Sequence, residues 1–134
     1  MFIDQSLLHL TDDQLGMTHA DAREDLALVL EALPLPALVR TKEAAENGRF
    51  IRGAYRDAAG RGCVMHFLTG ATSKTELLSY DFGSEQALWA ARRIVRWFDY
   101  GTLSFEMVSE MLGEHIASRR AARRAEEEEL VLAC

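Results

Sequence analysis

The sequence predicts a mostly helical α+β domain, with about five helices packed around a short β-hairpin and an αα-hairpin toward the C-terminus. Three observations carry this prediction. Apolar residues recur at helical spacing in three stretches, serine or threonine precedes most of the helices as an N-cap, and a glycine-rich middle segment reads as two strands joined by a turn. With 134 residues and 49% apolar content, the chain can bury one core. We expect one globular domain over residues 1–125 and a frayed, acidic and then apolar tail over residues 126–134.

The first two helices are delimited by capping residues and prolines. Thr18 and Asp21 form a capping-box-like pair at the start of the first helix, and Pro34 ends it because the residue before a proline avoids the α region. Pro36 suits the first turn of the second helix, which Asn47-Gly48 ends. The apolar stripe of the first helix is Ala22, Leu26, Val29, Leu30 and Leu33, and its acidic residues, mostly on the opposite side, are Asp21, Glu24, Asp25 and Glu31.

The middle of the chain is predicted to be a β-hairpin. Phe50–Arg56 and Arg61–Leu68 read as strands, and the turn Asp57–Gly60 between them has an aspartate to start it and a glycine to take positive φ. Because a lone hairpin is marginally stable in water, it must pack on the helices. The alternative is a helix that begins near Cys63, since periodicity does not separate the two over so few residues.

Three serines mark the remaining helices. Ser73, with Glu76 three residues on, starts a short helix, Ser84 starts a long one that ends at Gly101, and Ser104 starts the last. The short connection makes the two long helices antiparallel neighbours, an αα-hairpin. Their apolar stripes are Leu88, Ala91, Ile94, Val95 and Phe98, and then Phe105, Val108, Met111, Leu112 and Ile116.

Composition and motifs exclude several classes of protein. No apolar run is long enough to span a membrane, and the N-terminus lacks the basic start and long apolar block of a signal peptide. The two cysteines, Cys63 and Cys134, make no disulfide framework, so we expect a cytoplasmic protein. A net charge of −6 argues against general affinity for nucleic acid. Gly60-Arg61-Gly62 lacks the lysine and serine of a phosphate-binding loop, and we expect no cofactor.

Cys63 and His66 form the candidate catalytic pair. If Cys63 opens a helix, the helix N-terminus and an imidazolium one turn on stabilise its thiolate, which is the minimal arrangement for thiol catalysis. Asp81 or Asp99 then orients the imidazole, and the spacing does not select between them. In the commoner alternative, Cys63 is a small buried residue in a strand, with His66 on the opposite face.

A metal site is not expected. Cys63 and His66 supply two ligands, whereas structural zinc needs four, usually as two close pairs. The other histidines, His9, His19 and His115, are scattered along the chain. His115 lies on the apolar side of its helix, where a histidine is usually part of the packed core.

Trp89, Arg93 and Trp97 are the candidate interaction residues. Their i, i+4, i+8 spacing aligns them on one helix face, with Arg93 placed for cation–π contacts with both indoles. Exposed tryptophan and arginine side chains anchor many protein interfaces. In the alternative, both tryptophans widen the buried face and the arginine stem packs over them, because a chain with 8% aromatic residues needs its large side chains in the core.

The two long helices also fit a DNA-binding helix-turn-helix, since the turn between them is short and contains glycine. The second helix, however, begins with Glu106, Glu110 and Glu114, which DNA phosphates would repel. Nucleic-acid binding is therefore the least favoured function.

Gly53-Ala54, the turn Asp57–Gly60, Cys63 and Trp97-Phe98-Asp99 follow one another along the chain. This order resembles a small bacterial domain family of unknown function, whose members show a Gly-Ala strand, an Asp-x-x-Gly turn, a cysteine and a later Trp-Asn-Asp. The resemblance covers about half of the chain, with a shorter spacing from turn to cysteine and with Trp-Phe-Asp in place of Trp-Asn-Asp. It implies no activity, and it raises interest in Cys63 and Asp99.

These features favour a cytoplasmic interaction or regulatory protein without catalysis, and the rival is a small thiol-dependent enzyme built on Cys63. The end of the last helix carries an arginine block, a glutamate block and an apolar end: Arg119, Arg120, Arg123 and Arg124, then Glu126, Glu127, Glu128 and Glu129, then Leu130–Cys134. A second copy in antiparallel orientation would set arginines against glutamates and cover the apolar end. We therefore expect self-association or another protein partner, and no membrane.

Overall fold

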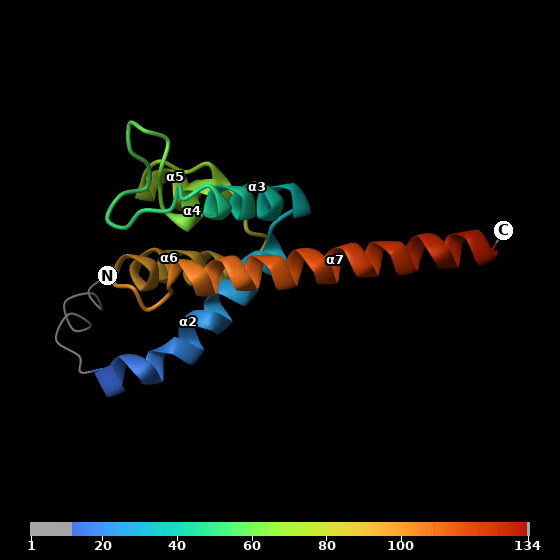
Figure 1. Ribbon diagram of the computed structural model, residues 1–134, viewed down its shortest axis with the longest axis horizontal. Helices are drawn as coiled ribbons and strands as arrows, with labels where there is room; N and C mark the ends of the chain where they lie inside the picture. The colour runs from blue at the N-terminus through green and yellow to red at the C-terminus, as the bar shows by residue number, and fades with distance from the viewer. Residues whose placement is uncertain (1–11, 134) are drawn as a thin grey trace.

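The computed structural model describes the fold of residues 12–133 and the side chains of residues 21–133. Over that range it is all-helical, with six helices and no β-strand (Figure 1). The expectations about the N-terminal leader, His9, His19 and Cys134 concern residues or side chains outside those ranges. No helix in the described part is both long and apolar enough to cross a membrane. In chain order the helices are α2 (Asp12–Ala32), α3 (Leu35–Glu46), α4 (Val64–Thr69), α5 (Lys74–Ser79), α6 (Glu85–Asp99) and α7 (Phe105–Ala133).

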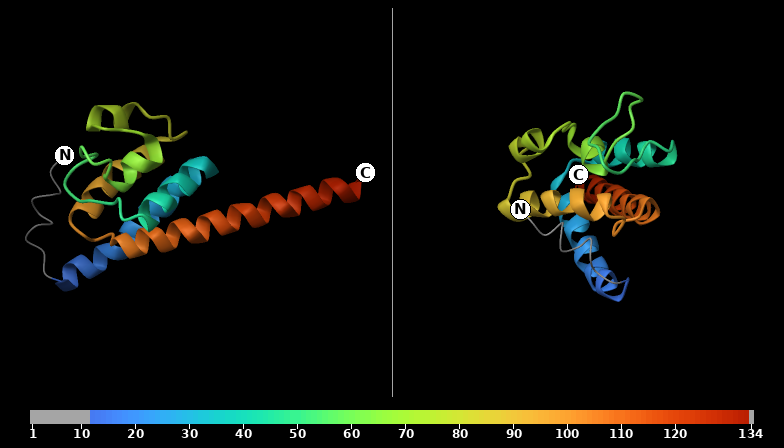
Figure 2. Two further views of the ribbon diagram at one scale, coloured as in Figure 1. Left: turned by 45° about the horizontal axis from the view of Figure 1, so that its top comes forward. Right: turned by 90° about the vertical axis from the view of Figure 1, so that its left-hand side faces the viewer.

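The helices pack in two main pairs, α2 with α6 and α3 with α7. The short helix α4 fills the space between α3 and α6, and α5 leans on α6 (Figure 2). Helices α6 and α7 are joined by residues 100–104, yet each packs mainly on a different partner. The expected side-by-side αα-hairpin is therefore not formed, because each apolar stripe is covered by an earlier helix.

The capping serines delimit the helices as predicted. Ser73, Ser84 and Ser104 each accept a hydrogen bond at Oγ from the backbone amide three residues on, over 3.2, 3.1 and 3.0 Å. Asn47 caps the end of α3, and Gly48 follows with a φ of +68°. The predicted start of the first helix at Thr18 is wrong, because α2 already begins at Asp12.

The predicted β-hairpin is wrong, and residues 50–62 form a loop. Phe50 and Arg56 make only isolated bridges, both to Gly62. Gly62 donates its amide to Arg49 and accepts at its carbonyl from Ile51, while the Cys63 amide donates to Tyr55, so Gly62 is bridged on both sides but neither bridge extends into a ladder. The predicted turn is present, since Gly60 has a φ of +80° and donates to the carbonyl of Asp57.

The alternative helix near Cys63 is confirmed: Cys63 is the extended N-cap residue of α4. Four side chains of α4 enter the core, where Val64, Met65, Phe67 and Leu68 are buried. Four buried side chains on one short helix fix its position more strongly than strand pairing of a glycine-rich segment would.

An aromatic cluster ties this loop to the junction of α6 and α7. The ring centroid of Phe50 lies 5.5 Å from that of Phe98 and 5.8 Å from that of Phe105. Arg52 covers the cluster, with its guanidinium 4.3 Å from the Phe105 centroid and its Nε donating to the Phe98 carbonyl over 3.0 Å. The loop is thus held at a defined place beside the C-terminal end of α6.

Candidate functional site

Cys63 lies inside the core with 1% of its surface exposed. Burial, together with the charge of Asp99, raises the pKa of its thiol from 9.0 to about 12, although hydrogen bonds from the backbone amides of Met65 and His66 act to lower it. The backbone amides of the first turn of α4 do not offset the effect of burial on this pKa. The thiol is therefore protonated at neutral pH, and the helix N-terminus does not make it a nucleophile.

The other two candidate catalytic residues are engaged elsewhere. His66 uses Nδ1 for the carbonyl of Ala71 at 3.0 Å, which places a hydrogen on Nδ1. Asp99 accepts a hydrogen bond at Oδ1 from the backbone amide of Gly53 over 3.0 Å. Asp81, the other candidate orienting residue, is exposed and accepts from Gly83. The described residues thus bring no base within hydrogen-bonding distance of the Cys63 sulfur.

Trp89, Arg93 and Trp97 do not form one exposed surface. Trp97 is buried at 7% exposure and donates its indole Nε1 to Asp25, and Arg93 binds the same carboxylate. Trp89 is 45% exposed, and the cation over its ring is Arg92, at 4.5 Å. Helical spacing placed the three side chains correctly along α6, but α2 covers one end of the row.

Helix α7 continues far beyond the body of the molecule (Figure 1). Its last buried residue is Ile116, and Arg119 then donates two short hydrogen bonds to the carbonyls of Leu30 and Leu33 at the end of α2. From Arg120 to Ala133 every residue is exposed. We call residues 120–133 the free segment of α7. The glutamate run is helical in this segment, and the expected fraying of the tail stays a prediction.

The apolar end of the free segment is the most exposed apolar group in the described chain. Leu130, Val131 and Leu132 are 67%, 74% and 86% exposed. Exposed leucine and valine at such fractions, three in succession, are typical of contact surfaces. Sequence reasoning had found this feature from composition alone.

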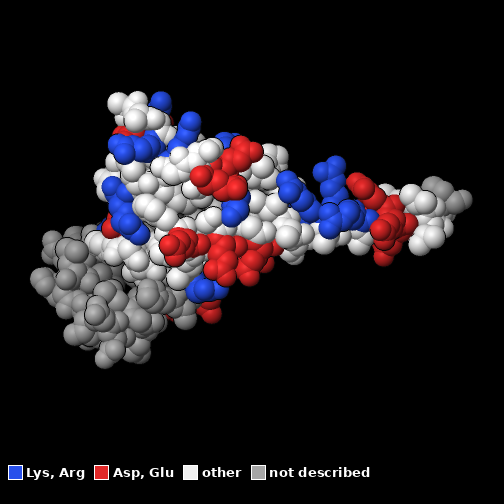
Figure 3. All heavy atoms as spheres, in the orientation of Figure 1, with Lys and Arg blue, Asp and Glu red and all other residues white. Residues whose placement is uncertain are grey.

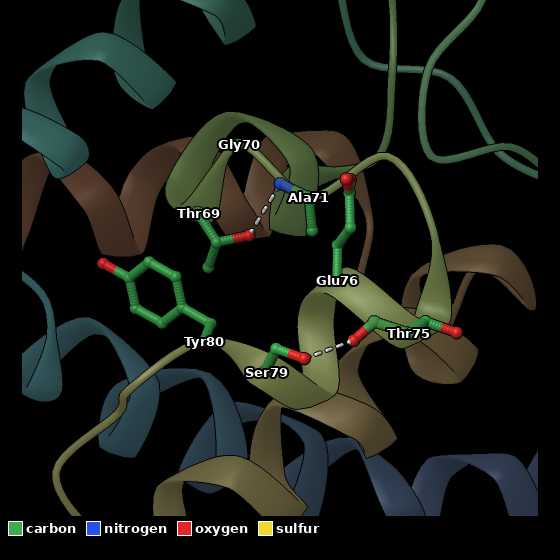
Figure 4. A pocket seen from close by; sticks show the side chains of 7 residues that line it. All are labelled: Thr69, Gly70, Ala71, Thr75, Glu76, Ser79 and Tyr80. Atoms are coloured by element: carbon green, nitrogen blue, oxygen red, sulfur yellow. Dashed lines mark hydrogen bonds between the residues drawn. The ribbon is translucent and has the colours of Figure 1, made fainter.

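A polar hollow of about 390 Å³ lies between the end of α4 and α5 (Figure 4). Two of its hydroxyl groups are already used locally: Thr69 donates to the Met65 carbonyl over 2.7 Å and Ser79 to the Thr75 carbonyl over 3.0 Å. Glu76 accepts from both the amide and the hydroxyl of Thr72. This hollow therefore offers few unpaired groups to a ligand.

A second cavity, of about 250 Å³, is strongly basic and was missed by sequence reasoning. It lies between α5, α6 and the 50–62 loop, and its polar lining is Tyr55, Lys74, Arg92, Arg96 and Asp99. The available signal was the i, i+4 spacing of Arg92 and Arg96, which aligns both on one face of α6. No group of three or more His, Cys, Asp or Glu suited to a metal ion occurs in the described part of the chain.

No protein-family model, curated protein sequence or solved structure matches this chain. The resemblance to the small bacterial domain family therefore stays a prediction.

Proposed function

We propose that this chain is a cytoplasmic interaction protein that acts without catalysis and pairs with a second copy of itself through the free segment of α7. The observation that carries the proposal is the exposure of Leu130, Val131 and Leu132 at the end of a helix whose described residues are all exposed beyond Arg119. The cytoplasmic location rests on the two-cysteine composition.

The free segment is too short to be a stable helix by itself. It has 14 residues from Arg120 to Ala133, and isolated helices of roughly 12 to 15 residues are marginal in water. Four glutamates near its C-terminal end oppose the helix dipole, and the ion pair of Arg123 with Glu127, both largely exposed, adds little. A partner helix would supply the packing that the segment lacks.

The charge order of the segment selects a second copy in antiparallel orientation. Arginines come first and glutamates follow, as the blue, red and then white atoms along the projecting helix show in Figure 3. A parallel copy would set arginine against arginine, whereas an antiparallel copy sets each block against its opposite. The protein thus contains both halves of a complementary pair.

Residue spacing along the segment also sets a register. Ala117, Ala121, Arg124, Glu128 and Val131 follow at intervals of four and three residues, the repeat that keeps one helix face against a neighbour. With Arg124 opposite Glu128 of the second copy, Ala121 falls opposite Val131 and Ala133 falls opposite Arg119. The two free segments, each about 20 Å long, then overlap along their full length.

This register brings the apolar end to a groove at the foot of α7. The groove, of about 330 Å³, lies between α3 and α7 and includes Val39, Ile116, Ala117 and Arg120 in its lining. Leu132 of the second copy comes level with Arg120 at its edge. The arginine stem and the neighbouring apolar side chains cover the leucine there.

Charge reversal tests the pairing, with Cys134→Ser in every chain to prevent disulfide cross-linking. In sedimentation velocity we expect the parent to dimerise and Arg124→Glu or Glu128→Arg, each alone, to weaken dimerisation at least tenfold by facing like charges. An equimolar mixture of the two variants should regain it, because each unlike pair re-forms between the different chains. Arg23→Glu, on the exposed face of α2, is the matched control and should leave dimerisation unchanged.

Two results would count against the proposal. A parent protein that stays monomeric at about 100 μM would leave no affinity worth assigning. A mixture that associates no better than its separate components would show that Arg124 and Glu128 do not face each other.

A further inference from the structure

The basic cavity beside α6 is independent of the free segment. Tyr55 reaches it from the 50–62 loop, Lys74 from the first turn of α5, and Arg92 and Arg96 from successive turns of α6. These residues are distant in sequence, so folding brings them together.

The cavity has the opposite charge to the molecule. Three cations and one carboxylate, Asp99, line it, for a formal charge of +2 on a chain whose net charge is −6. Asp99 is already hydrogen-bonded by the Gly53 amide. Converging cations repel one another, and an anion bound among them removes that repulsion.

Several donors in the cavity have no acceptor among the described residues. The Lys74 ammonium makes no hydrogen bond or ion pair there, and the Arg92 guanidinium makes only its contact with the Trp89 ring. The Tyr55 hydroxyl makes no hydrogen bond to a described residue either. Burial, Cys63 and Asp99 raise the pKa of Tyr55, so the phenol stays protonated and able to donate. The lining thus combines a net positive charge with three hydrogen-bond donors that have no acceptor among the described residues: an ammonium, a guanidinium and a phenol.

The rest of the lining is apolar. Leu77, which is 1% exposed, and the half-buried Val95 form a wall beside the cations. A volume of about 250 Å³ lies below the usual range for drug-sized ligands, so it fits one ring or a short chain beside an anionic group.

We infer that this cavity binds a small organic phosphate monoester. A phosphate dianion matches the +2 lining, and its oxygens accept from ammonium, guanidinium and phenol together. A carboxylate carries one charge and two oxygens, and it would leave a donor unused. The organic group lies against Leu77 and Val95.

Phenyl phosphate is the probe, titrated calorimetrically into the full-length chain carrying Cys134→Ser. We expect saturable binding with a Kd of about 1 mM or tighter, competition by inorganic phosphate, and no binding of benzyl alcohol. Because Trp89 contacts Arg92, its fluorescence should change at the same concentrations. Lys74→Gln and Arg92→Gln should each weaken binding about tenfold, whereas Arg23→Gln, an equal loss of charge on α2, should not.

Three results would overturn the inference. The first is no saturable heat with phenyl phosphate, and the second is an equal loss in the Arg23→Gln control, which would indicate general attraction and no site. The third is a phosphotyrosine peptide that binds far more tightly than phenyl phosphate, which would assign the cavity to a protein segment. Circular dichroism of each variant confirms that the helices are retained.

Discussion

Asp25 on α2 and Arg93 on α6 form a two-pronged ion pair, with Arg93 Nε 2.9 Å from Asp25 Oδ2 and Nη2 2.8 Å from Oδ1. The indole of Trp97, one turn along α6, donates to the same carboxylate over 3.0 Å. Asp25 is 9% exposed, so three donors replace the water that its charge has lost. These bonds raise the pKa of Arg93 and fix the rotation of α6 against α2.

Removing the Asp25 carboxylate should therefore destabilise the fold. We expect Asp25→Ala to lower the free energy of unfolding by about 2 kcal/mol, below the range for fully buried pairs because Arg93 is partly exposed. Glu24→Ala, on the exposed side of the same turn, should change it by less than about 0.5 kcal/mol. Urea unfolding followed by circular dichroism measures both. Equal losses would mean that the three hydrogen bonds contribute nothing specific.

Gly62 and Gly113 should respond to alanine with opposite signs. A Cβ on Gly62 would lie 2.2 Å from the Tyr55 carbonyl oxygen, so the loop must move and Gly62→Ala should lose about 3 kcal/mol. A Cβ on Gly113, inside α7, meets only the Lys42 side chain at 3.8 Å, and Gly113→Ala should gain up to about 1 kcal/mol. Thermal unfolding of the two variants tests the pair. A tolerated Gly62→Ala would show that the loop is not closed around this residue.

The buried thiol of Cys63 makes the protein sensitive to alkali. Its pKa is about 12 when folded and about 9 when unfolded, so its contribution is complete below pH 9 and is lost as the pH rises from there toward 12. The free energy of unfolding should fall by about 1.4 kcal/mol per pH unit in that window from this group. In a Cys134→Ser background, adding Cys63→Ala should remove this part of the slope between pH 9 and 10.5. Iodoacetamide should label Cys63 only after unfolding, and rapid labelling of the native protein at pH 8 would restore the thiol-enzyme hypothesis.

Arg119 should stabilise the end of α2, whereas its neighbour should not. The Arg119 guanidinium donates to the carbonyls of Leu30 and Leu33 at the C-terminal end of α2, where the last carbonyls lack a full set of helical partners, and its charge complements the helix dipole. Arg119→Met should lower the free energy of unfolding by about 1 kcal/mol, and Arg120→Met, at an exposed position, should leave it within about 0.5 kcal/mol. Because Arg120 faces the proposed dimer contact, both must be measured at concentrations where the parent is monomeric.

Prediction from sequence succeeded where the cause was local. Ser73, Ser84 and Ser104 bond amides three residues away, and Pro36 and Gly48 act through their own φ angles, so none of them depends on the rest of the fold. The hairpin failed because strand pairing depends on a distant neighbour. The 50–62 loop instead binds Phe98 and Asp99 through Arg52 and Gly53.

The candidate sites divide in the same way. The apolar end of α7 followed from composition, because three apolar residues come directly after a run of glutamates. The basic cavity did not, because Tyr55, Lys74 and Arg92 come from three separate elements. The catalytic hypothesis for Cys63 required its thiol to be exposed to solvent. The spacing of residues in the sequence does not show whether a side chain is exposed.

By itself, the sequence determined where most helices begin and end and which of their faces are apolar, because caps, prolines and helical periodicity act within a few residues. Only the tertiary structure decided which face meets which neighbour. Asp25, placed by periodicity among the solvent-facing acids of its helix, is buried because Arg93 and Trp97 approach it from α6. The pairing of α2 with α6 is set by the sum of many side-chain contacts across the core, and no short stretch of sequence contains that sum.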